Sequence, residues 1–319
     1  MRFAFTDDQL AFRDAVADLL EKECPPDAVR AAWANESGRT DGCWDALGEM
    51  GVLAARAPEA AGGLGLTELD LVLLAEATGR FALPEPFVEH AMVAAPVVPS
   101  SWRTVSAALG PSPLVPCADS ADAVLLEDDE RLLFVPRAAL VLESRPSVDH
   151  SRHAAAVDWD AGRAEITEVG GPEELAAGFD RGALGTAAQL LGLAAALLDT
   201  TVAYATERRQ FGVPIGSQQA IKHKLADVRM GLEFARPLAY RAAYSLTHGE
   251  PDASVHVSMA KARAGDVAML AARHALQCHG AIGYSFEYDL QLWMKRVWSL
   301  VVTWGDGAWH RERVARAIL

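Results

Sequence analysis

The sequence predicts a mostly α-helical protein with a small β-domain in the middle of the chain. Apolar residues recur at helical spacing near both ends, and short apolar runs bounded by Asp, Pro and Ser lie between them. The length of 319 residues suits two or three domains. We therefore expect an N-terminal helical domain over residues 1–103, a small β-domain over 104–171 and a C-terminal four-helix bundle over 172–319.

The first domain is expected to contain three helices. TDDQ at 6–9 fits a capping box before the first helix, because Thr can accept a backbone N–H while Gln reaches back to the cap. A second helix is expected over 44–50 and a third over 67–79. The glycine-rich segment 60–65 lies between them. It has no strand before it and no Lys after it, so we interpret it as a plain turn rather than a phosphate-binding loop.

The middle domain has the pattern of short strands. A domain of roughly 65 residues has little interior of its own, so we expect its strands to pack against the helices. Apolar and alternating segments bounded by turn-forming residues predict strands at 123–126, 132–135, 139–142, 155–160 and 165–169.

The last part of the chain predicts three long helices followed by two shorter ones. Ala and Leu dominate their apolar stripes, which allows the helices to pack closely in an antiparallel bundle. The expected helices cover 181–209, 217–247, 252–279, 287–303 and 307–319.

Composition and charge exclude several classes of protein. Hydrophobic residues make up 51% of the chain and charged residues 23%, which excludes a disordered chain. The net charge of −14 argues against nucleic-acid binding, and no uninterrupted apolar run approaches the ~18 residues of a membrane helix. The acidic N-terminus offers no signal peptide, so we expect a cytoplasmic protein. The cysteines lack metal-binding spacing and are expected to be reduced thiols: Cys24, Cys43, Cys117 and Cys278.

Two segments near helix ends could bind an anionic ligand. In ERRQFG at 207–212, arginine offers a planar donor fork to a phosphate, and the next helix start offers free N–H groups. A solvated helix end, where cations suit the helix dipole, explains the same residues equally well. QCHGAIGY at 277–284 is a weaker signal, because glycines at a helix end also serve as caps. We interpret its His279 as a satisfied loop histidine rather than a proton carrier.

Together with other motifs, these segments resemble the acyl-CoA dehydrogenase family over nearly the whole chain. The resemblance implies a fold with an N-terminal helical domain, a β-domain and a C-terminal four-helix bundle. It also implies FAD as cofactor and oxidation of an acyl-CoA thioester to the 2-enoyl-CoA, with electrons commonly passed to an electron-transferring flavoprotein. The motifs are PEAAGGLGL at 58–66, LPEPF at 83–87, ERRQFG at 207–212, QQ at 218–219 and QCHGAIGY at 277–284.

The resemblance also assigns residues to an FAD site. Arg208 resembles the family's pyrophosphate-binding arginine, and Gln210 and Phe211 resemble its neighbours beside the cofactor. In this family these groups contact a flavin that is bound mainly by the adjacent subunit. The residues that match positions touching the adenosine half are Gln219, Gln277, Gly280 and Ala281.

The chain departs from the family where the chemistry takes place. Its β-region lacks the TEPGAGSD-like loop and the Trp-Ile-Thr segment that hold the flavin ring. Trp304 stands where the family commonly has its catalytic glutamate, and Gly182 stands where some relatives carry the base instead. An indole nitrogen has no basic lone pair, so Trp304 cannot remove a proton. Asp306 is a candidate substitute base, although a helix-capping or solvated Asp is the favoured interpretation.

The favoured interpretation is a subunit of a heteromeric acyl-CoA dehydrogenase that has no catalytic residue of its own. The chain resembles the β-type subunits of the actinobacterial α2β2 enzymes that shorten steroid side chains, particularly over 304–313. It would share FAD and the acyl-CoA substrate with a full-length α-type partner. Two alternatives stay open: a self-sufficient homomeric dehydrogenase that uses Asp306 or a relocated base, and a non-catalytic scaffolding homologue with a decayed flavin site.

Overall fold

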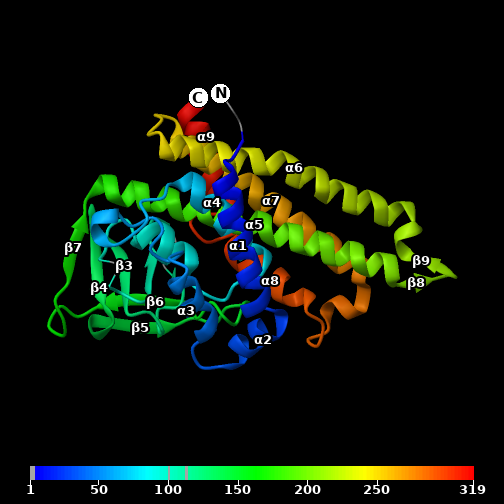
Figure 1. Ribbon diagram of the computed structural model, residues 1–319, viewed down its shortest axis with the longest axis horizontal. Helices are drawn as coiled ribbons and strands as arrows, with labels where there is room; N and C mark the ends of the chain where they lie inside the picture. Colours follow the sequence, from blue (N-terminus) through cyan, green and yellow to red (C-terminus); the bar gives the residue numbers. More distant parts are fainter. Residues whose placement is uncertain (1–3, 100, 112–113) are drawn as a thin grey trace.

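The computed structural model describes residues 4–99, 101–111 and 114–319. Figure 1 shows a β-region at one end of the molecule and long helices that extend from it to the other end. The fold class predicted from the sequence, mostly helical with a small β-region, is confirmed. The domain boundaries at 103 and 171 stay predictions.

The N-terminal part is helical and begins with the predicted capping box. The Gln9 N–H donates to Thr6 Oγ1 at 3.2 Å, and the Thr6 N–H donates to Gln9 Oε1 at 2.9 Å. The structure also contains helical elements that were not expected from the sequence: a short helix with Pro26 at its first turn, a 3-10 helix of three residues and a π-helix. The elements are α1 (Asp7–Glu23), α2 (Pro26–Ala34), α3 (Asp41–Glu49), η1 (Glu59–Ala61), α4 (Glu68–Arg80) and the π-helix η2 (Val88–Ala94).

The glycine-rich segment before α4 is a turn, as predicted. The Gly63 N–H donates to the Pro58 carbonyl at 3.1 Å, and the Gly65 N–H donates to the Ala57 carbonyl at 3.0 Å. These donors are therefore used within the backbone. Gly65 also has a φ of +61°, which favours glycine at this position.

The β-region consists of two small sheets that enclose a core between them. Every predicted strand is present, and the structure adds β1 and β2. The first sheet has the order β1-β3-β4-β7, with β1 and β3 parallel, and the second has the antiparallel order β2-β6-β5. Val124 and Val135 face the core between the sheets, whereas Leu125 and Phe134 belong to the main core. The first sheet therefore packs against the helices, as expected. The strands are β1 (Val105–Ala108), β2 (Leu114–Val115), β3 (Ala123–Asp128), β4 (Arg131–Pro136), β5 (Leu140–Ser144), β6 (Ala155–Trp159) and β7 (Thr167–Gly170).

The C-terminal part contains the three long and two short helices that the sequence predicts. α5 contacts both α6 and α7, which also contact each other, while α8 packs on α5 and α7 and α9 packs on α7. The first helix was expected over 181–209, but it begins nine residues earlier, at Pro172, and does not reach Arg209. It ends at Glu207 instead, because the next residues form a hairpin of β8 (Arg209–Gln210) and β9 (Val213–Pro214). The helices are α5 (Pro172–Glu207), α6 (Gln219–Thr247), α7 (Ala253–His279), α8 (Leu290–Leu300) and α9 (Gly307–Ile318).

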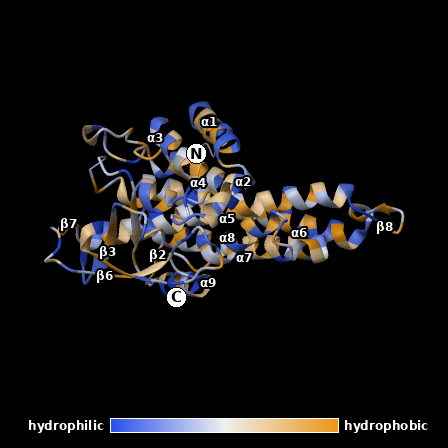
Figure 2. Ribbon diagram, turned by 90° about the horizontal axis from the view of Figure 1, so that it is seen from below, coloured by the Kyte–Doolittle hydropathy of each residue, from blue (hydrophilic) through white to orange (hydrophobic). Residues whose placement is uncertain are grey.

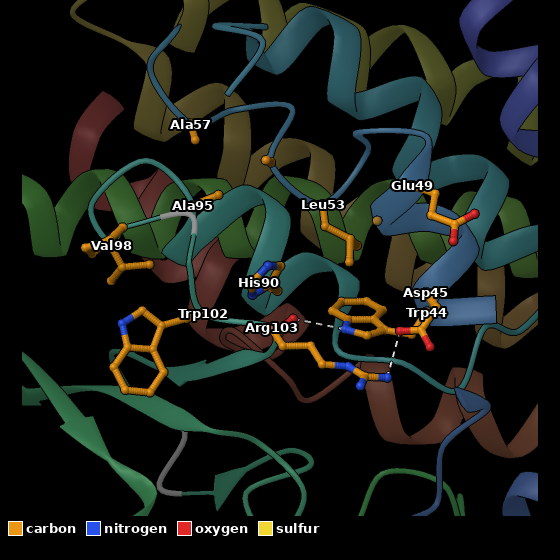
Figure 3. Close-up of a pocket in the computed structure, with 13 residues that line it drawn as sticks. Trp44, Asp45, Glu49, Leu53, Ala57, His90, Ala95, Val98, Trp102 and Arg103 are labelled. Carbon is orange, nitrogen blue, oxygen red and sulfur yellow. Dashed lines mark hydrogen bonds and ion pairs between the residues drawn. The ribbon is translucent and has the colours of Figure 1, made fainter. Parts of the chain in front are cut away.

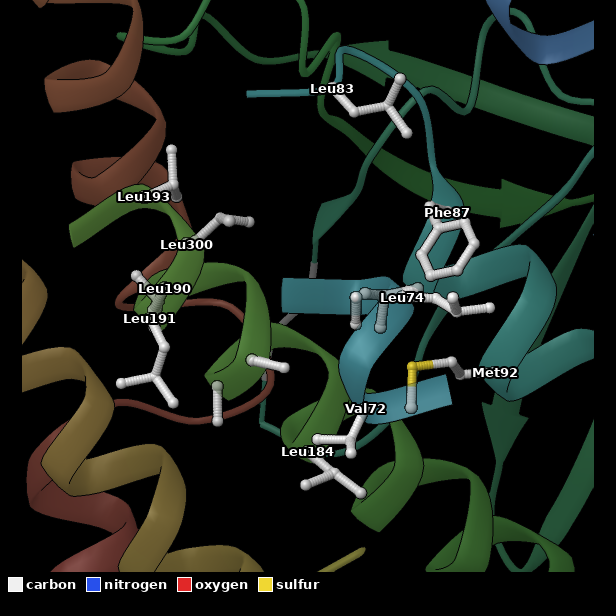
Figure 4. Close-up of a cluster of buried hydrophobic side chains, with 14 of the residues drawn as sticks. Val72, Leu74, Leu83, Phe87, Met92, Leu184, Leu190, Leu191, Leu193 and Leu300 are labelled. Atoms are coloured by element: carbon white, nitrogen blue, oxygen red, sulfur yellow. The ribbon is translucent and has the colours of Figure 1, made fainter. Parts of the chain in front are cut away.

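α5 is the central helix of the molecule and joins the N- and C-terminal parts. A Cβ on Gly192 of α5 would lie 2.0 Å from the Glu76 carbonyl oxygen of α4, so the two helices approach too closely for a larger residue. Figure 4 shows aliphatic side chains of α4 and α5 meeting in this core. α5 is long and apolar enough to cross a membrane, but 94% of its apolar window is buried inside the protein. It is therefore a core helix. Figure 2 shows that α1 and α6 instead carry both hydrophilic and hydrophobic residues.

Candidate functional site

The hairpin between α5 and α6 projects from the end of the molecule opposite the sheets (Figure 1). Gln210 pairs with Val213 across it, which leaves Phe211 and Gly212 as the two loop residues. Both have positive φ angles, +53° and +83°, as a two-residue hairpin loop of this hand requires. Positive φ is uncommon for a bulky residue, and the Phe211 side chain is also 97% exposed. A bulky residue whose backbone has a positive φ while its ring lies in solvent makes Phe211 a candidate functional residue.

Arg208 lies at the C-cap of α5, immediately before this hairpin. Its N–H donates to the Tyr204 carbonyl at 2.8 Å, and its carbonyl accepts from the Ile215 N–H at 2.8 Å. These two bonds fix the backbone. The Arg208 side chain is exposed and has no ion pair among the residues that the structure describes. It is free to bind an anion.

The second predicted segment lies beside the end of α5. The ring of His279, the last residue of α7, stacks on the ring of Tyr204 with centroids 4.2 Å apart. His279 is thus not the loop histidine that we expected. It is buried, its Nδ1 donates to the Ala275 carbonyl at 2.8 Å, and its Nε2 has no partner among the described residues. Burial lowers its pKa, so it is held neutral.

The remaining residues assigned to the FAD site are exposed around these helix ends. Gln219 is the first residue of α6, and Gln277 lies in the last turn of α7. Gly280 caps α7 with a φ of +64°, and a Cβ built on it would meet no atom within 4 Å. Ala281 follows in the short helix η5 (Gly280–Tyr284). The structure therefore places both predicted segments at neighbouring helix ends, on open surface.

Trp304 and Gly182, the two positions at which the resemblance leads us to look for a catalytic base, are in direct contact. Trp304 is 2% exposed and lies in the loop between α8 and α9. A Cβ built on Gly182 of α5 would lie 2.4 Å from the Trp304 indole, so only glycine fits beneath the ring. Phe179 lies one turn earlier on α5, with its ring centroid 6.2 Å from that of Trp304. The indole therefore fills the space above Gly182.

Two buried titratable residues that we did not predict hold the Trp304 loop. Lys261 Nζ donates to the Val301 carbonyl at 3.2 Å and to the Gly305 carbonyl at 3.0 Å, and His310 Nε2 donates to the Trp304 carbonyl at 2.8 Å. Burial lowers the pKa of Lys261 to about 7 and that of His310 to about 4. A lysine on the Ala-rich buried stripe of α7 was the available signal in the sequence.

Asp306 caps a helix, which was the favoured interpretation of this residue. It is the N-cap of α9, and its carboxylate accepts the Trp309 N–H at 2.8 Å. One carboxylate oxygen is thus engaged with the backbone.

Comparison with known proteins identifies the family. The model for the acyl-CoA dehydrogenase N-terminal domain matches residues 6–99, and the model for the acyl-CoA dehydrogenase C-terminal domain matches residues 171–319. The chain belongs to the acyl-CoA dehydrogenase family. The part of the chain between the two matches holds the two sheets.

Individual relatives match the chain along most of its length. It is 31% identical over 295 residues to acyl-CoA dehydrogenase IpdE2 of Mycolicibacterium smegmatis, covering 89% of this chain and 90% of that protein. The ChsE4-ChsE5 complex from Mycobacterium tuberculosis contains a chain with a TM-score of 0.87 and 22% identity, covering 100% of this chain and 99% of the other. The Tcur3481-Tcur3483 steroid ACAD G363A variant gives a TM-score of 0.86 at 23% identity, covering 98% of both chains. These two structures support the fold.

Family membership supports FAD as the cofactor, and the residues present suit part of this cofactor better than they suit the reacting substrate. The exposed Arg208 guanidinium and the open surface at Gly280 suit the charged nucleotide half. The surroundings of Gly182 do not suit a reacting thioester, because the Trp304 indole fills the space above it. A catalytic base must lie within reach of the carbon that it deprotonates, and neither of these positions carries one.

Proposed function

We propose that this chain is the non-catalytic subunit of a heteromeric, FAD-dependent acyl-CoA dehydrogenase that oxidises an acyl-CoA to the 2-enoyl-CoA. The observation that carries the proposal is the packing of the Trp304 indole on Gly182. The two positions at which the family places its base hold an indole and a glycine in contact with each other. The proton abstractor then comes from a full-length α-type partner, and α2β2 is the expected assembly.

The reaction explains why the partner is needed. A base removes the proton alpha to the thioester carbonyl while the beta hydrogen leaves with its electron pair, and a carbon–carbon double bond forms. Bound FAD would supply the acceptor for that hydride. In this chain Arg208 would bind the pyrophosphate, with Gln210 and Phe211 beside it. The residues proposed to line the adenosine half are Gln219, Gln277, Gly280 and Ala281.

The proposal also covers the substrate, the electron acceptor and the cellular location of the protein. The resemblance over 304–313 to β-type subunits that shorten steroid side chains leads us to propose the thioester of a steroid side chain as the substrate, and one structure of similar fold is named as a steroid acyl-CoA dehydrogenase. An electron-transferring flavoprotein is the proposed acceptor. The four cysteines are free and buried, in keeping with the cytoplasm as the proposed location.

Purification with and without the partner tests this function. We expect the chain alone to be colourless and the complex to carry one FAD per pair of unlike chains, measured by flavin absorbance. A yellow, active chain without a partner would instead support the homomeric alternative. The absence of flavin from both preparations would support the scaffolding alternative.

The Arg208→Ala variant tests whether Arg208 contributes to FAD binding. Loss of one charge-assisted hydrogen bond should weaken FAD retention in the complex by about 1.5–3 kcal/mol, measured by flavin release during dilution. Arg316→Ala is the matched control, because Arg316 is exposed on α9 and pairs only with Glu312 among the described residues. Equal retention in both variants would remove Arg208 from the site.

A further inference from the structure

A cavity of about 380 Å³ lies between α3, the end of η2 and the segment that leads into β1. Its size is within the range of small-molecule sites. It shares no residue with the Trp304 loop or with the exposed helix ends around Arg208. Most of its lining residues are apolar or aromatic (Figure 3), while polar atoms supply nearly half of its surface. The lining comprises Trp44, Asp45, Gly48, Glu49, Leu53, Ala54, Ala57, His90, Ala95, Val98, Pro99, Trp102 and Arg103.

His90 is the polar group built into this cavity. Its side chain belongs to η2, is 7% exposed, and lies between Trp44 and Trp102 in Figure 3. The Val105 N–H donates to its Nδ1 at 3.0 Å, which places the ring proton on Nε2. That Nε2–H has no hydrogen-bond partner among the described residues. Burial, with a contribution from Arg39, lowers the pKa of His90 to about 4, so the ring is neutral near pH 7.

The neutral His90 donor and the aromatic side chains around it determine which kind of ligand the cavity can bind. The Trp44 ring lies edge-on to His90 with centroids 5.4 Å apart, and its Nε1–H is already used by the Arg103 carbonyl at 3.1 Å. Arg103 in turn pairs with Asp45 at 2.7 Å, which leaves Glu49 as the uncompensated charge of the lining. A net negative lining disfavours an anion. A donor that lines the cavity without a protein partner favours an acceptor oxygen on the ligand.

We propose that this cavity binds an uncharged, flat, apolar molecule that carries a carbonyl oxygen, and that this oxygen accepts a hydrogen bond from His90 Nε2. The apolar body lies among Trp44, Leu53, Val98 and Trp102. The site requires neither FAD nor a partner residue, so it stands apart from the proposed function.

Two probes of nearly the same shape test the hydrogen bond. The purified protein, in the form in which it is isolated, is dialysed to equilibrium against 2-acetylnaphthalene or 2-ethylnaphthalene, and the free probe is measured by absorbance. We expect saturable binding of both, with the ketone bound about fivefold more tightly, the fold-change of one neutral hydrogen bond. In His90→Asn, which keeps an acceptor for the Val105 N–H but lacks Nε2–H, that preference should disappear.

A second variant tests the location without touching His90. Gly48→Leu adds a side chain on α3 that enters the cavity, and the nearest atom to its Cβ is Leu53 Cδ1 at 3.6 Å. It should abolish saturable binding of both probes. Gly42→Leu, on the same helix but with no atom within 4 Å of the new Cβ, should bind as the unaltered protein does. Absent saturable binding, equal affinity for the two probes, or equal binding by the two leucine variants would each overturn the proposal.

Discussion

Lys261 has its amine in the protein interior, where the charged form is destabilised. Its amine is buried, and although the Asp306 carboxylate opposes the shift, burial lowers the pKa from 10.5 to about 7. Between these values the unfolded chain binds more protons than the folded chain, so the free energy of unfolding should rise with pH. Below about pH 7 the folded chain bears the full cost of burying the charged amine, and above about pH 10.5 this cost is absent.

Chemical denaturation between pH 7 and 8.5 measures this effect. We expect the free energy of unfolding to rise with a slope of up to about 1.4 kcal/mol per pH unit from this residue. Lys261→Met removes the titrating group and should flatten the slope, although it also leaves the Val301 and Gly305 carbonyls without their donor. Equal slopes in the two proteins would mean that Lys261 stays charged in the folded state.

Phe211 is a residue whose conformation costs stability. Asn tolerates positive φ better than Phe, so Phe211→Asn should raise the free energy of unfolding of the chain by about 1 kcal/mol. In the complex with the proposed partner, the same change should weaken FAD retention, because an exposed ring is lost from the cofactor surface. A more stable chain with unchanged FAD retention would show that the strained ring does not serve the cofactor.

At the scale of elements, the contact between α5 and the loop between α8 and α9 explains why the space above Gly182 is filled. Gly182→Ala would place its Cβ 2.4 Å from the buried indole and should lower the free energy of unfolding by about 1–3 kcal/mol. The measurement is urea denaturation. Gly265→Ala on α7 is the control, since its nearest neighbour is 4.0 Å away and the change should stabilise the helix. A smaller cost of Gly182→Ala in a Trp304→Leu background would locate the strain at the indole.

The same elements show what the sequence could and could not predict. The long helices and the five strands were predictable because each repeats its apolar pattern over several residues. The β8–β9 hairpin was not, because its strands have two residues each and its loop is the unusual Phe-Gly. The resemblance to the family could place Trp304 at the position of the catalytic glutamate and Gly182 at the position where some relatives carry the base instead. Their contact depends on how α5 packs against the loop after α8, which no local pattern encodes.

At the scale of the whole molecule, the proposed heteromer needs a surface on which the partner can dock. Met230 and Phe234 lie one turn apart on α6 and are 55% and 68% exposed, so this helix presents an apolar stripe to solvent. α6 also begins next to the hairpin that carries Phe211. A partner seated on this stripe would therefore reach the surface proposed for FAD.

Phe234→Glu should prevent assembly with the partner without destabilising the chain, because the side chain is exposed and a charge there costs little in the free chain. Co-purification and size-exclusion chromatography measure assembly, and thermal unfolding of the isolated chain measures stability. Ile318→Glu is the control, since Ile318 is 67% exposed near the end of α9. Loss of the complex in Phe234→Glu alone would place the partner on α6, and FAD should be lost with it. An intact, flavin-loaded complex in both variants would move the interface to another face of the molecule.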